Sequence, residues 1–282
     1  MHPAPGRIVI IGGEGVAMSG PDDSGTIRTR AGVEIAYETH GKGPPMVLIA
    51  GLGDDRSSWA AQVEEFARDH RVVVFDNRGI GRSATPPGPY SIEQMADDTH
   101  ELARRLELGP VTAIGSSMGG AICQQWALRH PDDIQRLVIT NSWAERDVFT
   151  TALFDHWIAM AERGLSQHIV ESLLLFCFSP GYLRRKPETV KAFLETPAPP
   201  LEGFAAAAAA CRGHHTLDRV HEIRHPALVV AGEFDILTRP ELSRRLVERM
   251  KAARYVEVPT GHMVFWEMPD AFHRAVREFL KE

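Results

Sequence analysis

The sequence has little cysteine and no long apolar run. Its three cysteines, Cys123, Cys177 and Cys211, are odd in number and far apart. This spacing argues against a disulfide framework and against a Cys-x-x-Cys metal or redox site, and it favours a reducing compartment such as the cytoplasm. The apolar run 173–178 is far shorter than the roughly 20 residues that a bilayer span requires, so we expect no membrane partner.

Clusters of one charge are also missing. The 31 Lys and Arg residues are interspersed with 37 Asp and Glu residues, and the net charge is −6, which argues against a nucleic-acid partner. The turn Gly12-Gly13-Glu14-Gly15 invites a dinucleotide-binding interpretation, but no amphipathic helix follows it, so we expect no cofactor. The sequence leaves open whether the chain forms a homo-oligomer.

The first 25 residues differ from the rest of the chain. The stretch 7–11 could be mistaken for the core of a signal peptide, but the basic start is absent and the apolar run is short. Residues 21–25 have the composition of a loop. We therefore expect residues 1–25 to form an appended, flexible arm.

From residue 26 onward, strand patterns alternate with helical patterns. Residues 26–39 predict a hairpin. Buried strands are expected at 46–50, 71–76, 111–114, 137–140, 227–231 and 254–258, and helices at 59–68, 92–106, 121–129, 240–250 and 269–280. This alternation predicts an α/β fold with a mostly parallel central sheet and helices on both faces.

The alternation stops between residues 142 and 220. Helical patterns are expected there at 148–162, 166–178, 187–195 and 204–211, with no strand. We expect a helical lid at 143–220, inserted into a core made of 26–142 and 221–282. Aromatic side chains that could bind a substrate beneath this lid are Trp143, Trp157, Phe176, Phe178, Tyr182 and Trp266, and each could instead belong to the interior of the lid.

The most informative motif is Gly115-Ser116-Ser117-Met118-Gly119, which lies between a strand pattern and a helical pattern. A phosphate-binding loop would end in Gly-Lys-Ser/Thr, which is absent. A serine in a tight strand-to-helix turn, flanked by glycines that avoid a clash, is typical of a nucleophile elbow. Ser117 would be the nucleophile, and the N–H of Met118 would point to a developing oxyanion. Ser116 is expected to be structural.

A serine hydroxyl needs a base, and a histidine base needs a carboxylate to orient it. Asp235 follows the strand pattern 227–231, and His262 follows the strand pattern 254–258. Since carboxyl ends of parallel strands meet at one edge of a sheet, Ser117, Asp235 and His262 are expected to converge. Glu233 is the alternative to Asp235.

From about residue 26 to its end, the chain resembles an α/β-hydrolase. The blocks that carry the resemblance are Ala50-Gly51-Leu52-Gly53, 76–83, the elbow, Gly232-Glu233-Phe234-Asp235 and Gly261-His262. The resemblance implies a Ser117–His262–Asp235 triad and an oxyanion hole made by the backbone N–H groups of Leu52 and Met118. It also implies that Asp76 and Arg78 tie loops together beneath the site. The family usually has His where this chain has Ala50, which should alter local packing only.

Within the family, the local likeness is to 3-oxoadipate enol-lactonase and related esterases, through 203–212, Asp218 and 226–232. This implies a serine hydrolase that cleaves a small carboxylic ester or lactone. Arg212 could face a substrate carboxylate or lie on the surface. A carbon–carbon bond hydrolase of a vinylogous diketone and a slow-turnover ligand receptor remain alternatives.

Other reactive side chains have plainer explanations. His214, His215, His221 and His225 lack a carboxylate or cysteine pattern, so we expect no metal there. Cys123 is expected in the core.

Overall fold

The computed structural model describes residues 9–11, 14–16 and 20–282. Near the N-terminus, β1 (Val9–Ile11) and β2 (Glu14–Val16) pair antiparallel as a separate two-stranded sheet. The remaining residues of the expected arm before residue 20, including Gly12 and Gly13, lie outside the described residues. No helix in the described part of the chain combines the length and the apolar character needed to cross a bilayer.

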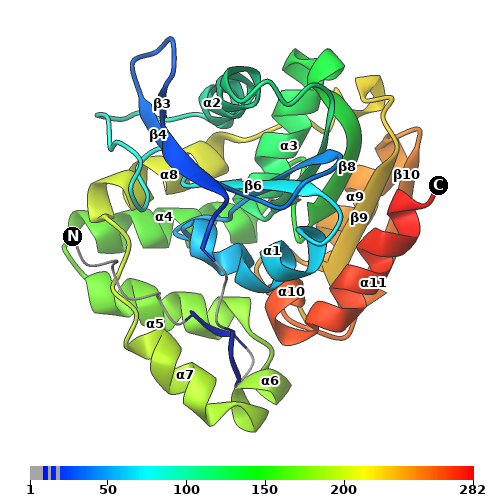
Figure 1. Cartoon of the computed structure of the whole chain (residues 1–282). Helices are drawn as coiled ribbons and strands as arrows, with labels where there is room; N and C mark the ends of the chain where they lie inside the picture. Colours follow the sequence, from blue (N-terminus) through cyan, green and yellow to red (C-terminus); the bar gives the residue numbers. More distant parts are fainter. Residues whose placement is uncertain (1–8, 12–13, 17–19) are drawn as a thin grey trace.

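The architecture is an eight-stranded, mostly parallel sheet between helices (Figure 1). The strands, in sheet order, are β10 (Ala253–Val258), β9 (Ala227–Gly232), β8 (Ile134–Thr140), β7 (Val111–Ser116), β5 (Pro45–Ile49), β6 (Arg71–Phe75), β4 (Glu34–His40) and β3 (Asp23–Arg28). Within this eight-stranded sheet, the β3–β4 and β4–β6 pairs are antiparallel and the other pairs are parallel. The strand order reverses at β5, between β6 and β7, and ligand crevices of open parallel sheets form at such switch points.

The central strands are continuous apolar runs because helices cover both faces of the sheet. All six residues of β7 and of β9 are buried. α1 (Ala60–Phe66) packs against α11 (Pro269–Leu280), whereas α2 (Ile92–Arg105) packs against α3 (Met118–Arg129) and α9 (Pro240–Arg249) packs on β9 and β10. The predicted fold class is therefore confirmed.

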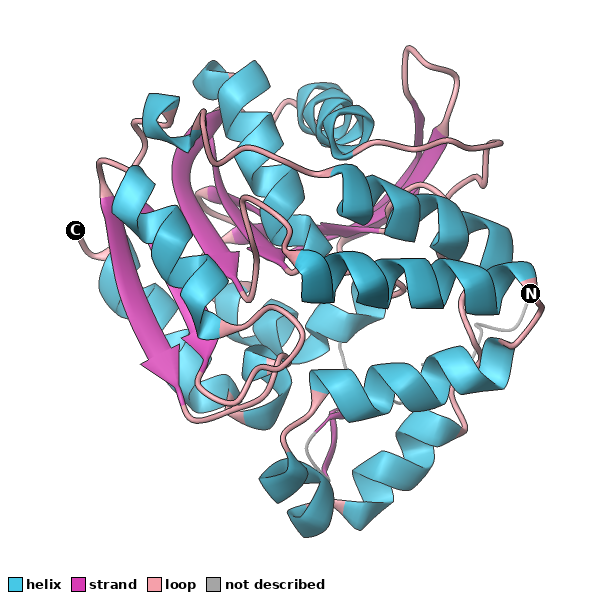
Figure 2. Cartoon of the chain, turned by 180° about the vertical axis from the view of Figure 1, so that it is seen from behind, coloured by secondary structure: helices cyan, strands magenta, loops and turns pink. Residues whose placement is uncertain are grey.

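Five helices separate β8 from β9 in the chain. They are α4 (Val148–Glu162), α5 (Ser166–Cys177), α6 (Pro180–Arg185), α7 (Pro187–Leu194) and α8 (Leu201–Gly213), and we call them the helical layer. α4 lies against α8, and α5 lies against α7. Figure 2 shows this group from behind, with the short β1–β2 hairpin next to it. Four of its helices were expected from the sequence, whereas α6 was not.

The sequence prediction was wrong for residues 23–25, which were expected to be part of a loop. They begin β3, and Asp23 and Gly25 stand opposite Thr39 and Tyr37 of β4. β3 is the edge strand of the sheet, and five of its six residues are exposed. An exposed edge strand has no apolar alternation to reveal it, so its pairing depends on backbone hydrogen bonds.

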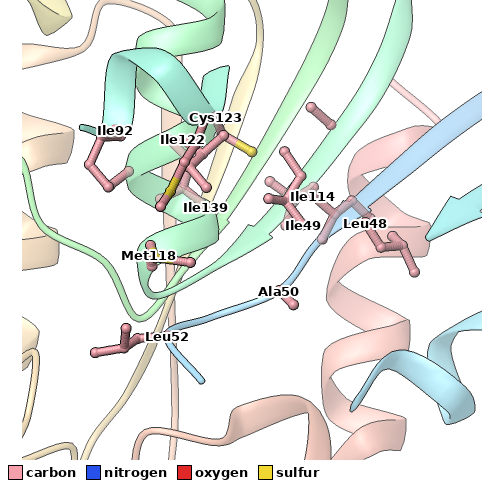
Figure 3. Packing of buried hydrophobic residues seen from close by; sticks show 14 of the residues in the cluster. Leu48, Ile49, Ala50, Leu52, Ile92, Ile114, Met118, Ile122, Cys123 and Ile139 are labelled. Carbon is pink, nitrogen blue, oxygen red and sulfur yellow. The ribbon is translucent and has the colours of Figure 1, made fainter. Parts of the chain in front are cut away.

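The core next to the carboxyl ends of β5 and β7 is closely packed. Figure 3 shows the buried side chains there, with Leu52 and Met118 where the chain leaves β5 and β7. Ile49, Ile114 and Ile122 are completely buried. Each such side chain contributes roughly 1.5–3 kcal/mol when it leaves water. This packing fixes the ends of the two strands from which the site is built.

Candidate active site

Ser117 occupies the turn between β7 and α3 in a backbone conformation that residues other than glycine rarely adopt. Its φ is 55° and its ψ is −116°. A Cβ on Gly115 would lie 2.2 Å from the carbonyl oxygen of Gly119, and a Cβ on Gly119 would lie 2.0 Å from that of Ile49. A positive φ such as that of Ser117 is a backbone strain that costs about 1–3 kcal/mol and is concentrated at functional sites. The two glycines are needed because the chain segments touch, as the motif predicted.

Asp235 and His262 come together at the ends of β9 and β10. Asp235 Oδ2 and His262 Nδ1 are 2.7 Å apart, and each residue is buried, with 3% of its surface exposed. Asp235 Oδ1 accepts hydrogen bonds from the N–H groups of Leu237 (2.8 Å) and Thr238 (3.0 Å). These bonds fix the carboxylate, which in turn fixes the imidazole ring. Glu233, the alternative acid, is exposed.

Two residues that the sequence reasoning missed support this pair. Thr238 Oγ1 lies 2.8 Å from Asp235 Oδ2 and 3.1 Å from His262 Nδ1. Asn141 accepts a hydrogen bond from the Gly232 N–H at 2.8 Å, and its side-chain amide donates to the His262 carbonyl oxygen. Asn141 has a φ of 47°, which asparagine tolerates. In the sequence, the one signal for the role of Asn141 was its position directly after an expected buried strand.

The candidate oxyanion donors are placed at the ends of neighbouring strands. Met118 begins α3, so its N–H is among the first donors of the helix, which have no partner within it. Within residues 20–282, neither this N–H nor that of Leu52 donates to a protein acceptor. Ser142 Oγ donates to the Ser117 carbonyl oxygen at 2.9 Å and steadies the elbow. Two backbone donors are thus available near Ser117.

Ser117 and His262 line the same narrow inner cavity, which has room for about 30 Å³. Its walls are Gly51, Leu52, Asp54, Ser116, Ser117, Phe154, Trp157, Leu173, Cys177, Phe178, Phe193, Leu237, His262 and Met263. Strand-end loops form one wall, and side chains near or on α4, α5 and α7 form the other. The two walls are joined where the Met263 N–H donates to the Cys177 carbonyl oxygen at 3.0 Å.

A wider outer cavity of about 420 Å³ adjoins the inner one. Asp54, Leu173 and Phe193 line both cavities. The other walls of the outer cavity come from the segment 53–58, from Ile80 and Gly81, from Val170 of α5, from α7, from residues 196–200 and from Trp266. A substrate that reaches Ser117 from this side would pass Asp54.

The aromatic residues predicted to bind substrate fall into three groups. Trp157 and Phe178 line the inner cavity, and Trp266 lines the outer one. Trp143 and Tyr182 line neither: Trp143 packs against Phe154 with ring centroids 5.6 Å apart, and Tyr182 stacks on Phe178 at 5.4 Å. Phe176 also lines neither and packs edge-on against Trp157. These three support the walls from behind.

Arg212 does not reach the cavities. Its guanidinium is half exposed and pairs with Asp155 at 2.5 Å on the surface of the helical layer. No Lys or Arg is among the residues that line either cavity in the described chain. Arg212 was expected either to face a substrate carboxylate or to lie on the surface, and the structure shows it on the surface.

Asp76 and Arg78 link the loops around the site. Asp76 accepts hydrogen bonds from the backbone N–H groups of Arg56 and Arg82, both at 2.8 Å. Arg78 makes a two-point ion pair with Asp98, at 2.7 and 2.8 Å. Burial raises the pKa of both carboxyl groups, and the arginines oppose that shift. The loop that bears Leu52 is therefore held from below.

The remaining reactive side chains take structural positions. His214 is buried against the edge of Trp143, and burial lowers its pKa to about 3, so it is neutral. Cys123 is completely buried in the core, and burial raises the pKa of its thiol. Among the described residues, the one group with metal-ligand spacing is His100, His130 and Asp133, at the far ends of α2 and α3 from the cavities. The His100 and His130 rings stack in parallel.

Comparison with known proteins agrees with this fold. Residues 44–269 match the family model described as alpha/beta hydrolase fold. The chain is 34% identical to "Putative carbamate hydrolase RutD" of Rhizobium rhizogenes, covering 87% of this chain and 97% of that protein. It is 29% identical to 3-oxoadipate enol-lactonase 2 of Acinetobacter baylyi, covering 90% and 95%. The crystal structure of the enol-lactonase from Burkholderia xenovorans LB400 is similar with a TM-score of 0.87 and 30% identity, covering 92% and 100%.

Proposed function

Since this chain belongs to the α/β-hydrolase family, we propose that it is a serine hydrolase that cleaves a carboxylic ester or a lactone through an acyl-enzyme. The observation that carries the proposal is that the strained Ser117 and His262 line one cavity. Asp235 holds the His262 ring through Nδ1, which leaves Nε2 free to act on Ser117. Relatives named as an enol-lactonase and as a carbamate hydrolase act, by their names, on carbonyl carbons bonded to a heteroatom.

In this proposal, Ser117 Oγ attacks the substrate carbonyl carbon while His262 Nε2 takes the hydroxyl proton. The Asp235 carboxylate keeps the proton of His262 on Nδ1 and stabilises the imidazolium. The N–H groups of Leu52 and Met118 bind the oxyanion of the tetrahedral intermediate. The C–O bond then breaks, the leaving alkoxide takes the proton from His262, and water activated by His262 releases the acid.

We also propose that the helical layer acts as a lid that selects the acyl group. The inner cavity, with about 30 Å³ of room, accepts an acetyl-sized group, and a longer acyl chain requires side chains of α4, α5 or α7 to move. The outer cavity of about 420 Å³ then receives the leaving group.

The decisive experiment is Ser117→Ala with p-nitrophenyl acetate and an organophosphonate probe. We expect kcat to fall by on the order of 10⁶, as found when a triad nucleophile is removed, and the probe to label wild type only. Ser116→Ala is the matched control, because it changes the neighbouring hydroxyl in the same cavity wall. Unchanged turnover by Ser117→Ala would refute the proposal.

The alternatives give different results. A vinylogous diketone turned over faster than any ester, lactone or carbamate would favour the carbon–carbon bond hydrolase. A stable acyl-enzyme after one turnover would favour the ligand receptor.

A further inference from the structure

Asp54 is an acidic side chain in the reaction cavity that the proposed mechanism does not use. It lies in the loop after β5, three residues beyond Gly51, and lines both the inner and the outer cavity. A Cβ on Gly51 would lie 3.3 Å from Asp54 Oδ2 and 3.5 Å from Ser117 Cβ. The carboxyl group and the nucleophilic side chain therefore flank a space about as wide as one methyl group.

No Lys or Arg of the described residues pairs with the Asp54 carboxylate. Within residues 20–282 the Asp54 side chain makes no hydrogen bond and no ion pair, in contrast to Asp76 and Asp98 below the loop. Asp54 is only partly exposed, and it borders cavities without Lys or Arg. An acid in this position interacts with whatever the cavity holds.

The other titratable groups around the cavities are few. His262 faces the inner cavity from the loop after β10, Cys177 faces it from α5, and Asp55 lines the outer cavity. Asp55 accepts a hydrogen bond from the Ser57 N–H at 2.8 Å and caps the short helix 56–59. The cavity-lining residues of α7, of 196–200 and of α10 (Val264–Glu267) carry no charge.

We propose that Asp54 is a specificity-determining residue that disfavours substrates with an anionic leaving group and favours neutral or cationic ones. The inference rests on the proposed function, because it takes the leaving group to occupy the outer cavity. A substrate carboxylate there would lie near Asp54 and Asp55, and no Lys or Arg is among the described residues that line the cavity. A quaternary ammonium group would be attracted to the same carboxylates and could lie on the ring of Trp266.

The protonation of Asp54 makes the proposal testable by pH. Burial and the neighbouring Asp55 raise the pKa of Asp54 to about 7, while His262 lowers it. The carboxyl group is therefore mostly neutral at pH 6 and mostly charged at pH 8. Discrimination between anionic and cationic substrates should strengthen across this range.

The experiment uses three esters that share an acetyl group: 3-acetoxybenzoate, its methyl ester, and 3-(trimethylammonio)phenyl acetate. The quantity measured is kcat/KM for the anionic ester divided by that for the cationic ester. At pH 8, Asp54→Asn should raise this ratio about tenfold, the effect of one pKa unit of charge interaction. At pH 6 the ratios of wild type and variant should converge. Intrinsic differences between leaving groups cancel when proteins are compared.

Asp218→Asn is the matched control, because it makes the same change on an exposed side chain that lines neither cavity. We expect its ratio to equal that of wild type. If Asp54→Asn fails to fold, the wild-type ratio alone decides, since it should fall between pH 6 and 8. An equal ratio in Asp54→Asn and wild type at pH 8, or a flat wild-type profile, overturns the inference. Absence of Ser117-dependent turnover of the neutral ester would instead refute the proposed function.

Discussion

Each of the two walls of the inner cavity is stabilised by a different kind of interaction. The strand-end wall, with Asp235 and His262, is fixed by hydrogen bonds from Leu237, Thr238 and Asn141. The opposite wall, from the helical layer, is held by packed rings such as Phe178 on Tyr182 and Trp157 on Phe204. Hydrogen bonds are directional, whereas apolar contacts are not. The first wall therefore fixes the geometry of the reaction, and the second can repack around different substrates.

Large apolar side chains are exposed on both sides of the cavity. The helical layer exposes large apolar side chains, with Leu175 at 63% and Val148 at 87% exposure. On the strand-end wall, the exposed Phe234 and Ile236 flank an Asp235 that is fully hydrogen-bonded. A change in the helical layer should thus alter which substrate is used, and a change in the strand-end wall should alter whether any substrate is used.

The largest expected effect tests the strand-end wall. Asp235→Asn should lower kcat for p-nitrophenyl acetate by about 10⁴, because the amide favours the wrong tautomer of His262. Glu233→Gln is the matched control, and it should retain the wild-type kcat because Glu233 is exposed. The opposite result, an inactive Glu233→Gln beside an active Asp235→Asn, would show that the orienting acid had been misassigned.

An intermediate effect tests the helical wall. Leu173→Ala should widen the junction of the two cavities and raise the kcat/KM ratio of p-nitrophenyl butyrate to acetate. The increase should be on the order of tenfold, since two further CH₂ groups gain about 0.8 kcal/mol each on burial. Leu175→Ala on the same helix points to solvent and should leave the ratio unchanged. An equal rise in both variants would mean that the helix has loosened as a whole.

The smallest effect concerns stability. Burial raises the pKa of Asp54 to about 7, from an ordinary value of 3.8, so the folded protein binds this proton more tightly than the unfolded chain does. The stabilisation from that proton is complete below about pH 4 and is lost as the pH rises through 7. The Tm difference between Asp54→Asn and wild type should therefore shift in favour of the variant as the pH rises from 4 to 8. The shift should be about 2–4 °C for each kcal/mol of stability that the wild type loses. A Tm difference that stays constant with pH would contradict the assigned burial.

The sequence predicted the elements that depend on local chemistry. The elbow could be recognised because two glycines are required where Gly115 and Gly119 touch neighbouring backbone. Asp235 and His262 could be placed because carboxyl ends of parallel strands share one edge. These features depend on the type of residue and its position relative to a strand, both of which are visible in the sequence.

Other features depend on tertiary contacts that the sequence does not display. Trp143 and Trp157 are both aromatic residues near or on α4, yet only Trp157 lines the cavity, because neighbouring side chains decide which face turns inward. The Arg212–Asp155 ion pair joins residues 57 positions apart. Asn141 contributes through its unusual φ and through two hydrogen bonds to distant segments.

The tight backbone contacts of the elbow also define how this protein could be redesigned. At Gly115 and Gly119 even a methyl group would overlap a carbonyl oxygen, so a mutant library that varies these positions would consist mostly of unfolded proteins. Leu173 and Phe193 line both cavities from the other wall, where packing can adjust. A search for new substrate ranges should therefore randomise α5 and α7 and leave the serine turn untouched.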